Sequence, residues 1–217
     1  MFQAVRPYLT GSEPVVCYQG AVVADPTTGA FLRHVPIPLE LAREAIDAIQ
    51  QEGWPLNCYV DDELYVAQVT WHSEQYARFQ HIELHEVGDL LAWLDRPPTK
   101  LVVVGDPDEL DELSAALRPR LGERLFIAKS LPIFLEFANP GVSKGVGLQV
   151  VADLLGFSRV GTVAFGDGEN DRELLEWADY AVAVENGDET VKEIADFICP
   201  AADEEGVAQV VEAFLAR

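Results

Sequence analysis

Six consecutive residues, 166–171 (GDGEND), include four acidic or amide side chains. They follow an apolar run, 162–165, that predicts a buried strand, and they precede a helical pattern. In an open parallel sheet, ligands bind beyond the carboxyl ends of the strands, which is where Asp167 falls. Asp167 and Asp171 would repel each other there unless a cation lay between them, and Mg²⁺ suits the place because it needs few hard oxygen ligands. The residues therefore predict a magnesium site, although a helix N-cap with a polar turn is the alternative.

A lysine in the segment 139–148 (NPGVSKGVGL) offers the matching positive charge. Lys144 stands at the start of a helix predicted over 145–157, where the helix dipole disfavours a positive charge. A lysine at this unfavourable position suggests a phosphate-binding site. The order of a Walker loop is absent, and an exposed lysine after a loop is the alternative. Asn170 and the helix start beside it supply amide donors for an anion. Acidic pair and lysine together predict a phosphoryl-transfer site. The glycines flanking the lysine are Gly141, Gly145 and Gly147.

The elements that position these residues alternate strictly between helix and strand from about residue 140 onward. This order is typical of a doubly wound parallel sheet, so we predict an α/β fold with a Rossmann-like parallel core. Residues 36–132 mix hairpin, helix and strand and predict an inserted α+β cap domain. The core then comprises residues 1–35 and 133–217, with one buried strand over 14–23 and part of a helix over 2–9.

Composition excludes several classes of partner. Lysine and arginine total 15 against 37 acids, so the formal net charge is −22, which repels nucleic acid and anionic membranes. The three cysteines are far apart and predict reduced thiols in a cytoplasmic protein. No apolar run of 18 residues occurs, so no membrane span is expected.

Four segments resemble haloacid dehalogenase-type phosphatases, and most closely the Cof-like sugar-phosphatase group. They are 14–37, where that family usually has an asparagine at the position of Gln19, and the three segments 141–145, 163–198 and 204–214. The resemblance covers essentially the whole chain, and the combination of GDGEND with SKG is specific for it. It implies a magnesium-dependent phosphatase acting on a small phosphomonoester, with a sugar phosphate as the expected substrate and the inserted domain as the part that selects it.

The resemblance also implies roles for individual residues. Asp167 is expected to be a magnesium ligand, and Asp171 a ligand or an acid next to the ligands. Lys144 is the expected catalytic residue, which neutralises the phosphate and an aspartyl-phosphate intermediate. Asn170 is expected to contact phosphate or substrate, and Asn186 to lie near Lys144 and the substrate.

One part of the family pattern is missing from the 217 residues. The family's nucleophile is an aspartate in a D-x-D-G-T segment, and its phosphate-binding T-G-R follows one strand later; neither occurs here. The first residues (MFQAVRPYL) resemble the helix after T-G-R. Because covalent phosphoryl transfer needs the missing carboxylate, we expect little or no activity from this chain alone.

Three explanations stay open: a longer natural protein, a non-catalytic phosphate-binding or interaction protein, and a second chain that supplies the missing piece. The absence of a central strand would leave unpaired strand edges, which favour association into a homo-oligomer.

Overall fold

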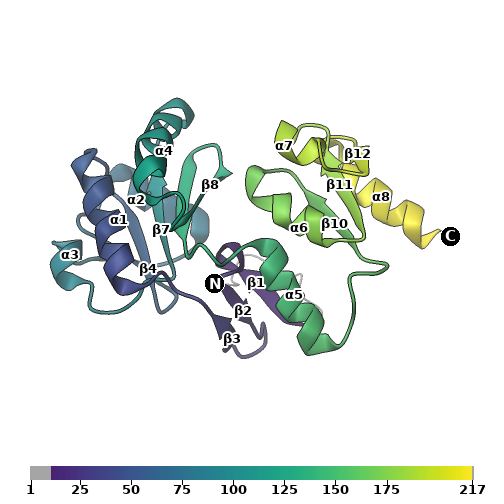
Figure 1. The fold of residues 1–217 in the computed structure, drawn as a ribbon, viewed down its shortest axis with the longest axis horizontal. Helices are drawn as coiled ribbons and strands as arrows, with labels where there is room; N and C mark the ends of the chain where they lie inside the picture. The colour runs from purple at the N-terminus through teal and green to yellow at the C-terminus, as the bar shows by residue number, and fades with distance from the viewer. Residues whose placement is uncertain (1–10, 217) are drawn as a thin grey trace. The chain divides into compact units, whose positions relative to one another are not determined.

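A computed structural model describes residues 11–216 of the chain (Figure 1). It consists of two compact units, the first ending at Val142 and the second beginning at Ser143. The helix expected over 2–9 lies outside the described residues. None of the described helices is long and apolar enough to cross a membrane.

The first unit opens with a three-stranded antiparallel sheet of order β1-β2-β3. We expected a single strand over 14–23, but a tight turn at Tyr18, Gln19 and Gly20 divides it. These three residues have φ values of 51°, 57° and 90°, which no strand can contain. The strands are β1 (Val15–Cys17), β2 (Val22–Ala24) and β3 (Phe31–His34).

A six-stranded mixed sheet of order β6-β5-β4-β7-β9-β8 forms the rest of the first unit's framework. The predicted hairpin is present, since β4 and β5 pair antiparallel around Asp61 and Asp62. The sheet continues to Ala138, because β9 pairs with both β7 and β8. The expected insertion over 36–132 stays a prediction. Its strands are β4 (Asn57–Val60), β5 (Glu63–Val66), β6 (Leu84–Glu86), β7 (Lys100–Val104), β8 (Phe126–Leu131) and β9 (Phe134–Ala138).

Helices cover both faces of this sheet. Residues such as Leu101 and Phe137 pack on one side against α1, α3 and α4, whereas Val102 and Phe134 pack on the other against α2. The sequence did not predict α2, whose N-terminus is held by the Thr70–Ser73 capping box. The helices are α1 (Leu39–Gln51), α2 (Trp71–Gln80), α3 (Leu90–Trp93) and α4 (Pro107–Leu121).

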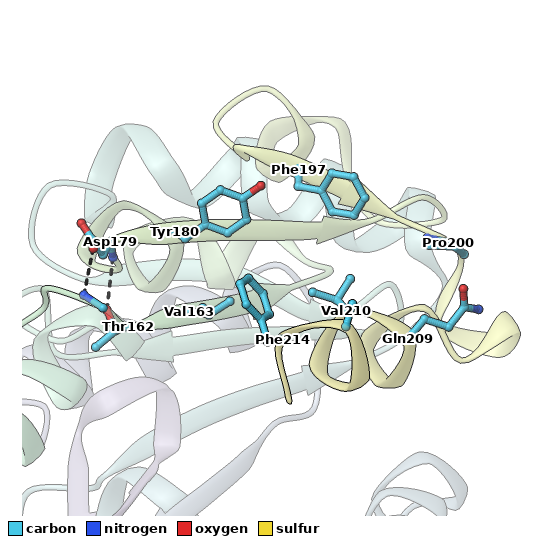
Figure 2. A pocket seen from close by; sticks show the side chains of 11 residues that line it. Thr162, Val163, Asp179, Tyr180, Phe197, Pro200, Gln209, Val210 and Phe214 are labelled. Carbon is cyan, nitrogen blue, oxygen red and sulfur yellow. Dashed lines mark hydrogen bonds between the residues drawn. The ribbon is translucent and has the colours of Figure 1, made fainter. Parts of the chain in front are cut away.

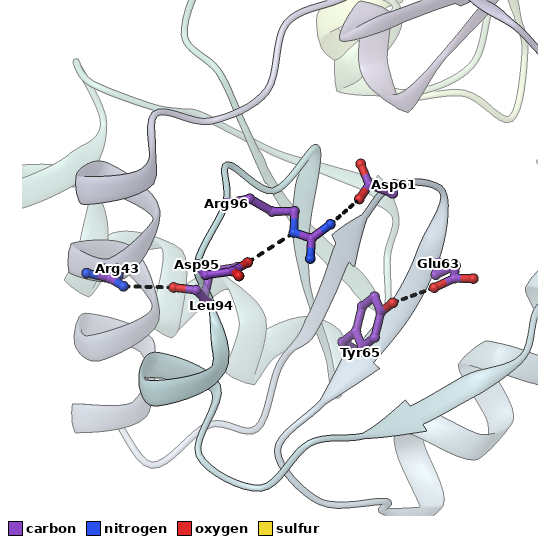
Figure 3. A network of polar contacts seen from close by, with 7 residues as sticks. All are labelled: Arg43, Asp61, Glu63, Tyr65, Leu94, Asp95 and Arg96. Atoms are coloured by element: carbon purple, nitrogen blue, oxygen red, sulfur yellow. Dashed lines mark hydrogen bonds and ion pairs between the residues drawn. The ribbon is translucent and has the colours of Figure 1, made fainter.

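Surface contacts fix the segment that leaves α3 (Figure 3). Arg43 on α1 donates to the carbonyl oxygen of Leu94 at 2.8 Å. Arg96 bridges Asp95 and Asp61, at 3.0 Å and 2.9 Å, and so ties this segment to the β4–β5 turn. Because all three side chains are exposed, we expect each pair to contribute little free energy of folding.

The second unit contains the predicted parallel sheet, with order β10-β11-β12. Small residues such as Ala164 and Ala183 pack against α6 and α7 on one face, and Val182 and Cys199 lie on the face of α8. The elements are α5 (Lys144–Leu155), β10 (Val163–Gly166), α6 (Arg172–Trp177), β11 (Tyr180–Val184), α7 (Glu189–Lys192), β12 (Phe197–Cys199) and α8 (Gly206–Leu215).

The face under α8 is incompletely filled. An apolar cavity of about 620 Å³ lies there, and Figure 2 shows Tyr180 and Phe197 of the sheet facing Val210 and Phe214 of the helix. Tyr180 and Phe214 form an edge-on ring contact at 6.3 Å. This parallel sheet therefore has one well-packed face and one partly open face.

Candidate functional site

The acidic segment predicted from the sequence forms a tight loop at the carboxyl end of β10. The buried carboxylate of Asp171 turns back into this loop. Its Oδ2 atom accepts the backbone N–H groups of Asp167, at 3.0 Å, and of Gly168, at 3.2 Å. Asp171 thus fixes the loop that presents the exposed side chain of Asp167.

Lys144 meets this loop from α5. The helix begins at Lys144 because the side chain of Ser143 caps it, accepting the N–H of Val146 at 3.2 Å. The Nζ atom of Lys144 lies 2.5 Å from Oδ1 of Asp171. Residues 27 positions apart in the chain are thereby brought into one charged cluster.

Two glycines allow this close approach of elements. A Cβ atom on Gly145 would lie 2.2 Å from the carbonyl oxygen of Glu173, so α5 and α6 could not pack as they do. A Cβ atom on Gly166 would lie 2.7 Å from the Cβ of Asp171. Both glycines are therefore part of how Lys144 and Asp171 reach each other.

The two carboxyl groups of the cluster differ in their affinity for a proton. Burial alone would raise the pKa of Asp171, but the charge and hydrogen bond of Lys144, with the two backbone N–H groups, hold it below its ordinary value. Burial and the neighbouring carboxylate of Asp171 raise the pKa of Asp167. Asp167 is thus the carboxylate that a further positive charge would stabilise most.

The carboxylate oxygens of Asp167 and Asp171 are the kind of ligand atom that Mg²⁺ prefers. Mg²⁺ is commonly bound by one or two carboxylates, with waters and substrate phosphate completing its shell, and Asp167 and Asp171 supply two. Within the described part of the chain, no three His, Cys, Asp or Glu side chains gather closely enough to hold a metal by themselves. Such a site would need oxygen ligands from substrate or solvent.

The two predicted asparagines lie in different surroundings. Asn170 is buried in the short helical turn Glu169–Asp171, within the same loop as the acidic pair. Asn186 is exposed after β11, and its Oδ1 atom accepts the N–H of Ala202 at 3.0 Å, so it fixes the turn that precedes α8. Their roles toward substrate stay predictions.

Sequence reasoning missed one contributor to the site, the backbone after β11. The N–H of Asp188 donates to the carbonyl oxygen of Asp167 at 2.8 Å. A Cβ atom on Gly187 would lie 3.0 Å from that same oxygen. The signal was available, because the carboxyl ends of neighbouring parallel strands meet at one edge of a sheet.

A family model described as "haloacid dehalogenase-like hydrolase" matches residues 1–211. The chain belongs to this family. The resemblance noted from the GDGEND and SKG segments is thereby confirmed, as is the α/β fold with its parallel sheet.

Individual relatives agree with the family. A 5-amino-6-(5-phospho-D-ribitylamino)uracil phosphatase, YitU of Bacillus subtilis, is 26% identical over 96% of this chain and 82% of its own length. A phosphoglycolate phosphatase of Methanosarcina mazei is 42% identical, over 33% of this chain and 31% of its own. The crystal structure of TM0651 from Thermotoga maritima superposes with a TM-score of 0.77 at 31% identity, over 96% of this chain and 78% of that one.

Proposed function

We propose that this haloacid dehalogenase-like hydrolase acts on a small phosphomonoester, of which a sugar phosphate is the expected type, and depends on Mg²⁺. The observation that carries the proposal is the cluster of Lys144, Asp171 and Asp167 at the carboxyl end of a parallel sheet. The relatives named as phosphatases support the reaction class, and YitU supports a phosphorylated polyol as one kind of substrate. Because the net charge of −22 repels an anionic substrate, a phosphate site on this chain needs local positive charge, which Lys144 supplies.

Each residue has a task in this scheme. Lys144 neutralises the phosphoryl oxygens, and its bond to Asp171 holds its Nζ atom in place. Asp171 also fixes the loop through two backbone N–H groups, so that Asp167 faces the ligand. Asp167 and Asp171 would hold Mg²⁺, which when bound offsets the charge that builds up on a transferring phosphoryl group.

The nucleophile is the missing element, since no D-x-D-G-T segment occurs in the 217 residues. We therefore propose that this chain by itself binds Mg²⁺ and phosphate but turns substrate over slowly or not at all. The same observation favours a second function, a non-catalytic phosphate-binding or interaction protein. The two functions differ in whether turnover appears once an aspartate-bearing segment is supplied.

Thermal unfolding with and without Mg²⁺ tests the binding step. A ligand that binds only the folded state raises the melting temperature, so Mg²⁺ should raise it for the natural chain and not for Asp167→Asn. Glu169→Gln is the matched control, because it removes a charge from the same loop and should keep the shift. An equal shift in the natural chain and Asp167→Asn would refute this metal site.

Turnover tests the catalytic step. Hydrolysis of a panel of sugar phosphates with Mg²⁺ is compared for the 217-residue chain and for a version extended at its amino end by a segment carrying D-x-D-G-T. The proposal expects turnover to rise in the extended version and to be lost again with Lys144→Met. Phosphate binding without turnover in a correctly folded extended version would favour the non-catalytic function.

A further inference from the structure

The first unit contains a cavity, at one end of its six-stranded sheet, that the proposed function does not use. It has a volume of about 210 Å³. Asn57 at the start of β4 lines it, together with Val66 and Val104 at the ends of β5 and β7. Thr70 and Ser73, at the N-terminus of α2, line it as well.

The connection to the second unit leaves the sheet at its other end. Phe137 pairs with Leu101 near the start of β7, and β9 ends one residue later, at Ala138. The cavity lies instead at Val104, the last residue of β7. It is therefore a feature of the first unit alone, at the end of the sheet away from that connection.

One buried polar atom at this cavity has no hydrogen-bond partner. Asn57 is 3% exposed, and within the described part of the chain its Oδ1 atom accepts no hydrogen bond. Asn57 stands opposite Val66 in the β4–β5 pair, so their side chains share one face of the sheet, and both residues line the cavity. A buried acceptor without a donor costs free energy, which a ligand carrying an N–H group would recover.

The two hydroxyl groups that line the cavity are already engaged. The hydroxyl of Thr70 donates to Oγ of Ser73 at 3.2 Å, and the hydroxyl of Ser73 donates to the carbonyl oxygen of Thr70 at 3.0 Å. The backbone N–H groups of the same two residues complete this capping box. The capping box therefore leaves no hydroxyl hydrogen for Asn57.

The walls of the cavity favour an uncharged ligand with an apolar surface. No Asp, Glu, Lys or Arg is among the described residues that line it, and an ion buried without an opposite charge is costly. The apolar side of the lining would leave the many hydroxyl groups of a polyol without partners. The apolar residues are Pro55, Leu56, Val66, Ala67, Leu90 and Val104.

The remaining polar side chains match an amide. Gln50 and Gln68 line the cavity together with Asn57, and each carboxamide offers an N–H donor beside a C=O acceptor. A ring that carries an N–H beside a C=O has the same two groups in complementary order. The volume is several times the roughly 30 Å³ share of one water molecule. It is also below the roughly 300–1,000 Å³ of sites for drug-sized ligands, so it suits a single ring.

We infer that this cavity binds a small uncharged cyclic amide, whose ring N–H donates to Oδ1 of Asn57 and whose ring lies against the apolar walls. The terminal torsion of an asparagine side chain is soft, so its carboxamide can turn toward a donor in the cavity. Packing alone does not account for Asn57, since a leucine there would bury no unpaired oxygen. The inference does not depend on the proposed phosphatase function.

Titration of the ¹⁵N-labelled 217-residue protein with 2-pyridone, followed by NMR, tests the site. N-methyl-2-pyridone is the matched control ligand, because it keeps the ring and the carbonyl group but has no N–H. We expect saturable shifts with 2-pyridone at the backbone N–H groups of Asn57, Gln68 and Ser73, and an affinity about tenfold or more lower for the N-methyl compound. No saturable shift with 2-pyridone, equal affinity for both compounds, or tighter binding of glycerol would each overturn the inference.

The variant Asn57→Leu separates a binding role from a structural one. It removes a buried oxygen that has no partner, so urea denaturation should show an unchanged or higher free energy of unfolding. The affinity for 2-pyridone should nevertheless fall about tenfold or more. A less stable variant that still binds 2-pyridone as the natural chain does would show that Asn57 is a structural residue and would contradict the inference.

A pair of tryptophan substitutions locates the site without touching Asn57. Gln68→Trp changes an exposed residue that lines the cavity and should block the binding of 2-pyridone. Gln51→Trp is the matched control, because Gln51 is exposed on α1, is not among the lining residues and contacts Asp47 on the surface. It should bind as the natural chain does. Equal binding by the two variants, whether kept or lost, would place the site elsewhere and refute the inference.

Discussion

The two units each contain a lysine–carboxylate pair, and the pairs differ in their access to solvent. The side chains of Lys100 and Glu136 in the first unit are 10% and 4% exposed, whereas that of Lys144 in the second is 31% exposed and its partner Asp171 7%. The carboxylate of Glu136 accepts from the side chains of Gln19, Lys100 and Ser130, which lie 117, 36 and 6 residues away. The carboxylate of Asp171 accepts instead from two adjacent backbone N–H groups and from Lys144.

This difference separates two uses of the same chemical pair. The side chain of Lys144 is exposed enough to exchange part of its contact with Asp171 for a ligand from solvent, as the proposed phosphate-binding role requires. Lys100 cannot leave Glu136 without burying an unpaired charge, so it can only add a ligand to an existing bond. The Lys100–Glu136 pair is therefore a structural contact beside a cavity. The Lys144–Asp171 pair lies at a loop that solvent can reach.

The largest effect is expected from removing one member of the buried pair. Glu136→Leu leaves Lys100 buried without its carboxylate, which we expect to cost about 3–5 kcal/mol of the free energy of unfolding. Urea denaturation measures it. The double variant Lys100→Met/Glu136→Leu should recover most of the loss, and a double variant as unstable as the single one would contradict the pairing.

A smaller effect is expected from the glycine that lets α5 and α6 pack. Gly145→Ala places a Cβ atom 2.2 Å from the carbonyl oxygen of Glu173, so the helices must separate. We expect a loss of about 1–3 kcal/mol in urea denaturation, as for overpacking generally. Gly141→Ala, whose Cβ would meet only the Asn139 side chain at 3.4 Å, is the control and should lose far less.

The sequence predicted the second unit better than the first, for physical reasons. The parallel sheet and the acidic loop were readable because helices and strands alternate and because Asp167, Asp171 and Lys144 fall at element ends. The pairing of Lys100 with Glu136 depends on β9 lying beside β7, which no local pattern encodes. The turn at Gln19 was hidden in the same way, since an apolar, β-branched run around it favours a strand and only distant contacts impose the left-handed conformation.

Strand pairing in the first unit shows the same limit. The pairing of β9 with both β7 and β8 is set by contacts between strands and not by a local sequence pattern. α2 was missed because its apolar residues are irregularly spaced and Ser73 stands where a capping box usually has Glu or Gln. Trp71, the first residue of this helix, is 68% exposed.

Lowering the pH should reduce the free energy of unfolding of the natural chain moderately relative to that of Lys100→Met/Glu136→Leu. Burial would raise the pKa of Glu136, but the charge of Lys100 and the hydrogen bonds from Ser130, Gln19 and Lys100 hold it below its ordinary value of 4.5. A group with a lowered pKa stabilises the fold above its unfolded-state value, and this contribution is lost as the pH falls through the folded-state value.

The free energy of unfolding of the natural chain should therefore fall relative to that of Lys100→Met/Glu136→Leu below about pH 4.5, by at most about 1.4 kcal/mol per pH unit. Urea denaturation of both proteins between pH 7 and pH 3 measures the difference. Parallel curves for the two proteins over this range would show that Glu136 is not held ionised by its partners.

The smallest effect is expected from the open pair. Lys144→Met removes a charge whose side chain is 31% exposed, and the carboxylate it leaves behind keeps the N–H groups of Asp167 and Gly168. Solvent and salt screen such a contact, so we expect a loss of no more than about 1 kcal/mol, shrinking further in high salt. Urea denaturation at low and high salt measures it beside Glu136→Leu. If Lys144→Met lost as much free energy of unfolding as Glu136→Leu, the two pairs would not differ in the way described. Lys144 would then be a structural residue with little freedom to bind a phosphate.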